Sequence, residues 1–249
     1  MLNLFQHLSY ITPPQSSPSR EEEQFRKYRC GFTLAEVLIT LVIIGVIAAI
    51  TVPTLITKYQ KEQTVTRLKK AYSALSQTTQ RAIADNGPIK TWEVGTAYSG
   101  PAATDFLNKY VTPYMSVMKK ANNNLNDWDH KYYNVNSETA YTQSCSRFYL
   151  NDGTSVTAII QTNNSTEIKI ELFVDINGDK KPNNLGRDIF RYLYYVYSGD
   201  DASLTGKFVP PGSNYSRNSI LSVCNNTSKY WCSTLIMKDS WQIKDDYPW

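Results

Sequence analysis

An apolar run from Phe32 to Thr57 is the feature that most constrains the fold of this chain. Glu36 is its only charged residue, and the run exceeds the roughly 20 apolar residues that a helix needs to cross a bilayer. A secretory signal peptide fits poorly, because its apolar part is normally about 7–15 residues long. Residues 32–57 are therefore predicted to form a membrane-spanning helix. A carboxylate in such a helix costs about 2.5–3.5 kcal/mol to insert, so Glu36 is expected to have a function and a partner.

The residues around the start of this run resemble the N-terminus of type IV prepilins and type II secretion pseudopilins. A basic cluster at residues 26–29 precedes Gly31, and the stretch GFTLAE from Gly31 to Glu36 matches the processing site of that family position by position. The resemblance implies that residues 1–31 form a leader, which a prepilin peptidase removes before it methylates the new amine of Phe32. That amine is a cation, and in a staggered filament it is expected to pair with Glu36 of a neighbouring subunit.

The helix is predicted to continue beyond the membrane over residues 58–86. Apolar side chains there recur at spacings of three and four, which places them on one helical face. They are Val65, Leu68, Tyr72, Leu75, Thr79 and Ala82. The pair Gly87-Pro88 supplies a stop signal. Pro53 should bend or loosen the helix, because proline removes a backbone hydrogen bond and clashes with the preceding turn. The resemblance implies the same loosening at Gly45.

Residues 87–249 are predicted to form a globular β-rich domain. Asp-Gly at 152–153 is a favoured hairpin turn between two apolar segments, and two later segments alternate apolar and polar residues. Four strands are thus expected, at residues 147–150, 154–160, 167–174 and 188–197. A short helix is expected near residues 102–110. The predicted fold is α+β and pilin-like, with one long helix packed on an antiparallel sheet of about four strands.

Three of the four cysteines follow the proposed cut, where the chain would enter a compartment in which disulfides persist. Cys224 and Cys232 bracket a short polar loop, NNTSKYW, and are predicted to form a disulfide. Cys145 is then left over, and the sequence alone does not fix the pairing. The alternative is three reduced and buried thiols. Cys30 would leave with the leader.

The segment from Asp175 to Asp188 places oxygen side chains at alternate positions around a glycine. Asp175, Asn177 and Asp179 can converge on one hard cation, which suits calcium. The segment is not an EF-hand, because its twelfth position is Gly186 rather than Glu. It loosely resembles the C-terminal calcium loops of some pseudopilins. The alternative is a polar turn in which Asp and Asn side chains bond their own backbone.

Motifs for catalysis are missing from the sequence. It contains no nucleophile elbow, P-loop, Rossmann glycine pattern or zinc spacing. His130 follows a carboxylate at Asp129, but no nucleophile is placed near it, and a surface-loop histidine is expected. The formal net charge of +4 implies no large basic field, so no nucleic-acid partner is inferred.

The resemblance implies a structural subunit of a type IV pilus or a type II secretion pseudopilus, and not an enzyme. The expected location is the bacterial inner membrane, as a single-pass protein with a cytoplasmic N-terminus, and then a periplasmic or surface filament. Its expected partners are a prepilin peptidase/methyltransferase, other pilin or pseudopilin subunits, the inner membrane and the assembly platform. Calcium is the one candidate cofactor. The alternative is a membrane-anchored periplasmic binding or enzyme domain that does not polymerise.

Overall fold

The computed structural model describes residues 31–122, 145–163, 167–178, 180–199, 201–226 and 229–249. The chain divides into two compact units, Met1–Thr54 and Leu55–Trp249. Residues 1–30 of the predicted leader, His130 and the predicted calcium ligand Asp179 lie outside the described residues.

The long helix predicted from the sequence is α2 (Leu34–Asn86), which is 53 residues long. It ends at Asn86, directly before the predicted stop signal Gly87-Pro88. Gly87 adopts a φ of +80°, and its amide donates a hydrogen bond to the carbonyl of Ile83 at 2.9 Å. This left-handed glycine satisfies one of the last carbonyls of the helix. Gly45 and Pro53 are both helical, so their loosening of the helix remains a prediction.

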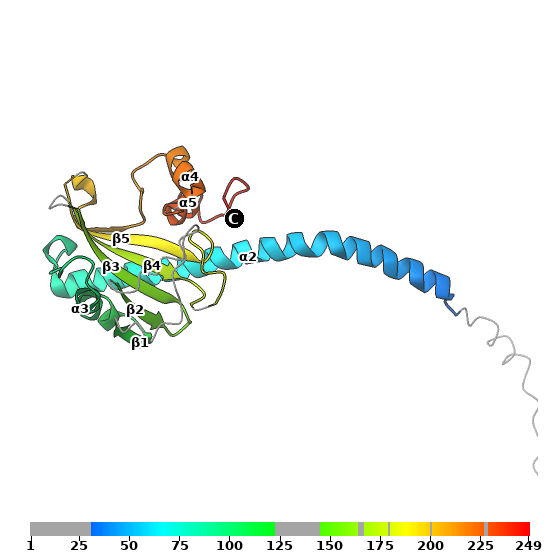
Figure 1. Ribbon diagram of the computed structural model, residues 1–249, viewed down its shortest axis with the longest axis horizontal. Coiled ribbons are helices and arrows are strands. Elements are labelled where there is room, and N and C mark those ends of the chain that lie inside the picture. The colour runs from blue at the N-terminus through cyan, green and yellow to red at the C-terminus, as the bar shows by residue number, and fades with distance from the viewer. Residues whose placement is uncertain (1–30, 123–144, 164–166, 179, 200, 227–228) are drawn as a thin grey trace, which may run out of the picture. The chain divides into compact units, whose positions relative to one another are not determined.

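A six-stranded antiparallel sheet forms the second layer of the unit Leu55–Trp249 (Figure 1). The strands, in spatial order, are β1 (Val117–Asn122), β2 (Cys145–Leu150), β3 (Ser155–Asn163), β4 (Glu167–Asp175), β5 (Ile189–Ser198) and β6 (Lys207–Val209). The four central strands confirm the prediction. The two edge strands exceed the predicted number, because VMKKAN carries two lysines and KFV is only three residues long. Neither segment shows the apolar alternation on which strand prediction depends.

Shorter helices surround the sheet. They are α3 (Gly100–Tyr110), α4 (Arg217–Asn225) and α5 (Cys232–Lys238), with 3-10 turns η2 (Ile89–Thr91), η3 (Thr112–Tyr114) and η5 (Ala202–Leu204). α3 confirms the helix expected near residues 102–110, and it packs beside β1 and β2, whereas α5 packs beside β5 (Figure 1). The sequence pattern did not predict α4 and α5. They are 9 and 7 residues long, which is too short for a helical repeat of apolar residues to stand out.

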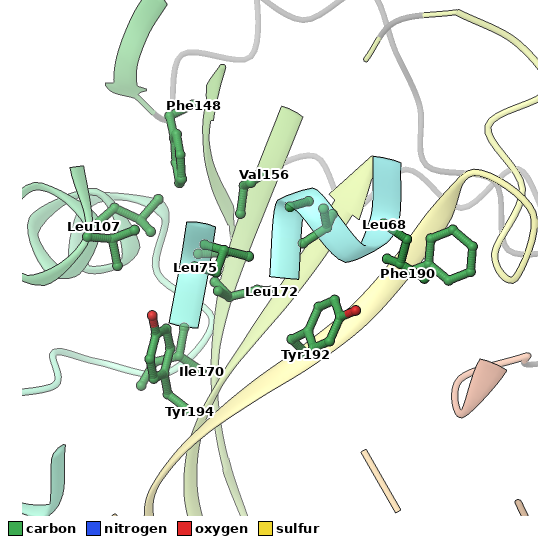
Figure 2. Packing of buried hydrophobic residues seen from close by; sticks show 14 of the residues in the cluster. Leu68, Leu75, Leu107, Phe148, Val156, Ile170, Leu172, Phe190, Tyr192 and Tyr194 are labelled. Atoms are coloured by element: carbon green, nitrogen blue, oxygen red, sulfur yellow. The ribbon is translucent and has the colours of Figure 1, made fainter. Parts of the chain in front are cut away.

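The main core lies between α2 and one face of the sheet (Figure 2). Leu68 and Leu75 of α2 are fully buried, and the predicted helical stripe to which they belong is buried or packs against this core. Even-numbered residues of the strands belong to this core: Phe148, Val156, Ile170, Leu172, Phe190, Tyr192 and Tyr194. A hydrogen bond of 2.8 Å between the hydroxyl groups of Thr79 and Tyr194 also ties α2 to the sheet. The soluble half of α2 is therefore an integral part of the domain.

The opposite face of the sheet is also partly covered. A smaller apolar cluster there contains Ile159, Phe173, Leu185 and Ile189. Glu171 and Arg191 form an ion pair on neighbouring strands of this face, and the Arg191 guanidinium lies 4.7 Å from the ring centroid of Tyr230. This cover on the opposite face of the sheet explains why the last six residues of β4 are buried on both faces.

Cys224 in α4 and Cys232 in α5 form a disulfide, which agrees with the predicted pairing. It joins two helices that pack against each other. Cys145 lies half-buried in β2, and burial raises the pKa of its thiol. A thiol in this state is a weak nucleophile at neutral pH.

Loss of the Cys224–Cys232 bridge should destabilise the domain moderately. The bridge closes a loop with a sequence separation of 8, and a loop of this length contributes about 2–3 kcal/mol by restricting the unfolded chain. We expect the double variant Cys224→Ser/Cys232→Ser to melt roughly 4–12 °C below the wild type in calorimetry. Cys145→Ser leaves the bridge intact, so it is the control and should melt closer to the wild type than the double variant does. Equal melting of the double variant and the wild type would contradict a stabilising bridge.

Candidate functional site

The first turn of α2 is held by reciprocal hydrogen bonds between Thr33 and Glu36. The Glu36 carboxylate accepts from the Thr33 backbone N–H at 2.8 Å and from the Thr33 hydroxyl at 3.0 Å. The Thr33 hydroxyl oxygen accepts from the Glu36 backbone N–H at 3.2 Å. This arrangement is a capping box, which satisfies N–H groups that the first helical turn leaves without partners. The Thr-x-x-Glu spacing signals it in the sequence, and reasoning from charge alone overlooked it.

The capping box leaves the charge of Glu36 without a cation inside the apolar run. The next cation along α2 is Lys58, which lies about 33 Å away along a helix. Hydrogen bonds from Thr33 partly satisfy the carboxylate oxygens but do not neutralise them. Within the described part of α2, no cation lies close enough along the helix to pair with Glu36.

The proposed cleavage point is exposed. Phe32 is 87% exposed, and Gly31 is also exposed. A Cβ added to Gly31 would meet no atom within 4 Å, and the backbone there is not left-handed. Nothing in the described chain thus requires glycine at position 31. A residue without a side chain allows another backbone to approach closely at this position.

The apolar half of α2 presents its side chains outward. From Leu34 to Ile56 its large apolar side chains are between 43% and 79% exposed. Within the described residues, α2 is the one helix that is long and apolar enough to cross a membrane, by length and composition. An apolar surface of this extent is covered in other proteins by lipid or by partner chains.

The loop between β4 and β5 contains the predicted calcium ligands. The Asp188 carboxylate accepts hydrogen bonds from the backbone N–H groups of Asn183 at 2.7 Å and Asn184 at 2.6 Å, and from the Asn177 side-chain amide at 3.2 Å. Burial raises the pKa of the Asp188 carboxyl, and the N–H donors of Asn184 and Asn183 oppose this rise. Asp175 accepts from the backbone N–H of Asn177 at 3.1 Å. These contacts are those of a polar turn that bonds its own backbone.

The described residues of this loop do not bring together an acidic set of metal ligands. Among the residues that the structure describes, no group of three or more His, Cys, Asp or Glu side chains is placed to hold a metal ion. The buried side-chain oxygens of Asn177 and Asn183 have no hydrogen-bond partner in that part of the chain. Amide oxygens are among the ligand types that calcium takes in proteins. Sequence reasoning included Asn177 but missed Asn183 and the central role of Asp188.

Comparison with known protein families gives two matches. Residues 26–52 match the prokaryotic N-terminal methylation motif, which is the signature of type IV pilins and pseudopilins. Residues 54–249 match a family of unknown function, DUF6613. The chain belongs to the DUF6613 family. No curated protein and no solved structure matches it.

The two family matches divide the DUF6613 protein close to the boundary between its compact units. The methylation motif confirms the resemblance to type IV pilins and pseudopilins, and the α+β arrangement of a long helix and an antiparallel sheet agrees with it. The protein is therefore a processed, pilin-like subunit, whose apolar helix is suited to anchoring in the inner membrane.

Proposed function

We propose that this DUF6613 protein is a structural subunit of a type IV pilus or a type II secretion pseudopilus. The observation that carries the proposal is the methylation motif at residues 26–52, placed at the start of an exposed apolar run that contains a single carboxylate. In this role the precursor is anchored in the bacterial inner membrane with its N-terminus in the cytoplasm. A prepilin peptidase cleaves before Phe32 and methylates it, and the assembly platform then transfers the subunit into a filament.

Pairing between subunits gives Glu36 a cation, which the apolar run from Phe32 to Thr57 lacks. Cleavage creates the amine of Phe32, one helical turn before Glu36. In a staggered filament the amine of an incoming subunit meets Glu36 of its neighbour, and the attraction offsets the cost of removing both charges from water. The capping box holds the carboxylate at the first turn, where the incoming amine can reach it.

The protein acts in this proposal as a substrate of the peptidase and as a building block, with no catalytic role of its own. The methylation motif favours this role over that of an enzyme. The alternative of an anchored periplasmic domain that does not polymerise requires the same apolar helix, but it gives no reason for a glycine at position 31.

Gly31→Leu should block maturation. A bulky side chain at the cut prevents close approach of the peptidase backbone, so we expect full-length precursor to accumulate in the membrane, with a loss of the mature form of about tenfold or more. Gly45→Leu is the matched control, because a Cβ at either glycine meets no atom within 4 Å. It should mature like the wild type. Immunoblots of membrane fractions measure both forms, and normal maturation of Gly31→Leu would contradict the proposed processing site.

We propose that the loop at 175–188 binds calcium. The candidate ligands are the carboxylate of Asp175 and the side-chain oxygens of Asn177 and Asn183, which have no hydrogen-bond partner among the described residues. A ligand that binds only the folded state raises stability by about 2.7 kcal/mol at a hundred times its dissociation constant. We expect saturating calcium to raise the melting temperature of the full-length protein in detergent by roughly 5–10 °C. Asp175→Ala should abolish the rise, whereas Asp245→Ala, an exposed carboxylate elsewhere, should keep it. A wild type that melts at one temperature with calcium and with chelator would leave the loop a polar turn.

A further inference from the structure

A pocket of about 320 Å³ lies between the second half of α2, the β4–β5 loop and the C-terminal tail. Arg67 lines it from α2, and Lys180, Lys181 and Arg187 line it from the loop. Trp249 lines it from the C-terminal tail. All of these residues belong to the unit Leu55–Trp249.

The pocket carries a large excess of positive charge. Asp188 is the one carboxylate side chain among its described lining residues, and it is buried and already accepts three N–H donors. In the part of the chain that the structure describes, none of the four lining cations forms an ion pair. Cations gathered in a concave site repel each other and attract an anion with several acceptor oxygens, such as a phosphate group.

Trp249 gives the pocket an amphipathic wall. The Arg187 guanidinium lies 5.4 Å from the Trp249 ring centroid, and the ammonium group of Lys61 lies 6.0 Å from it. Tryptophan and basic residues together are typical of the membrane–water interface, where the ring meets acyl chains and the cations meet phosphates.

The position of the pocket along α2 places it next to the predicted membrane span. Its first helical residue, Gln60, follows Thr57 by three residues, which is about 5 Å along a helix. The headgroup region on each side of a bilayer is roughly 5–8 Å thick. Helical side chains tilt toward the N-terminus, so the long Arg67 side chain leans toward the span. Gln60 therefore lies at the depth of the lipid headgroups, and Arg67, about 15 Å beyond Thr57 along the helix, extends its side chain back toward them.

We propose that this pocket binds the phosphate of an anionic phospholipid while the subunit is anchored in the bilayer. The positive-inside rule does not account for these cations, because the proposed orientation places this end of the helix outside the cytoplasm. The inference rests on the proposed function for the anchoring and orientation of α2 only. It assigns to the DUF6613 domain a contact with lipid that precedes assembly and that must be released when the subunit leaves the membrane.

Calorimetric titration of the full-length protein in neutral detergent tests the proposal. The ligands are short-chain phosphatidylglycerol, short-chain phosphatidylcholine and inorganic phosphate. The pocket variant is Arg67→Gln/Lys180→Gln/Lys181→Gln, and the matched control is Lys90→Gln/Lys207→Gln/Lys238→Gln. Both sets remove three exposed cations and change the net charge equally.

We expect the wild type and the control to bind phosphatidylglycerol, and the pocket variant to bind it about tenfold or more weakly. Phosphatidylcholine and inorganic phosphate should bind the wild type about tenfold or more weakly than phosphatidylglycerol. Equal affinity for inorganic phosphate would overturn the lipid assignment in favour of a soluble anion. Equal affinity for phosphatidylcholine, or an unchanged pocket variant, would overturn the headgroup site.

Flotation of the same proteins with phosphatidylcholine liposomes separates this proposal from the proposed function. Anchoring by α2 does not need the pocket, so the wild type and both triple variants should float. A wild type that does not float would contradict membrane anchoring, whatever the titrations show. A floating wild type without selectivity for phosphatidylglycerol would overturn the lipid site and leave the proposed function standing.

Discussion

Glu36→Gln is expected to reduce incorporation into filaments as severely as Glu36→Leu. A glutamine side chain at this position still accepts hydrogen bonds in the capping box, so it preserves the start of α2. It removes the charge that pairs with the incoming amine, and an unpaired buried charge costs about 3–5 kcal/mol, or more than about a hundredfold in an equilibrium constant. Both variants should still insert and be cleaved. Incorporation is measured in sheared surface fibres or assembled pseudopili against the wild type.

Thr33→Ala is the control that isolates the capping box from the charge. It removes the threonine hydroxyl, which accepts from Glu36 N–H and donates to the Glu36 carboxylate, but it leaves the carboxylate and its ionisation in place. Loss of a cap costs only about 1 kcal/mol, so we expect incorporation to remain within about tenfold of the wild type. If Glu36→Gln subunits assembled normally while the Glu36→Leu and Thr33→Ala variants failed, the function of Glu36 would be capping, and the pairing between subunits would be wrong.

Leu75→Ala is expected to destabilise the DUF6613 domain by about 2–5 kcal/mol. Leu75 is fully buried on the face of α2 that packs on the sheet. It belongs to the same apolar cluster as Leu172 and Tyr194 (Figure 2). Truncation removes apolar contacts and leaves a cavity that the rigid sheet cannot fill. For a domain of this size the melting temperature should fall by roughly 5–15 °C, measured by calorimetry.

Lys69→Ala is the matched control for Leu75→Ala. Lys69 lies on the same helix but is exposed, and a surface change of this kind usually alters stability by less than about 0.5 kcal/mol. Equal melting of the Leu75→Ala variant and the wild type would show that this face of α2 does not hold the helix on the sheet.

The elements that the sequence predicts well are those with long, regular apolar patterns. α2 and the four central strands repeat their periods over many residues, so packing and local preference agree there. The edge strands β1 and β6 gain their structure from hydrogen bonds to β2 and β5 rather than from their own pattern. α4 and α5 depend on the disulfide and on contact with each other, which no local period reveals.

The proposed processing site can be recognised in the sequence because its residues are contiguous. Gly31, Phe32 and Glu36 lie within one helical turn or just before it, and the Thr33 partner of Glu36 is in the same short motif. The cationic pocket was not predictable in the same way, since Arg67, the β4–β5 loop and Trp249 are far apart along the chain. The role of Asp188 as an acceptor of three N–H donors likewise depends on the fold of the loop.

Mass spectrometry of the mature N-terminus tests the central claim most directly. The full-length protein is expressed in a bacterium with a functional prepilin peptidase, recovered from the membrane and analysed as intact chain and as N-terminal peptide. Processing at the methylation motif predicts a chain that begins at N-methylated Phe32 and lacks residues 1–31. A membrane protein that retains its leader, or that begins at another residue without methylation, would contradict the assignment of this DUF6613 protein as a processed pilin-like subunit.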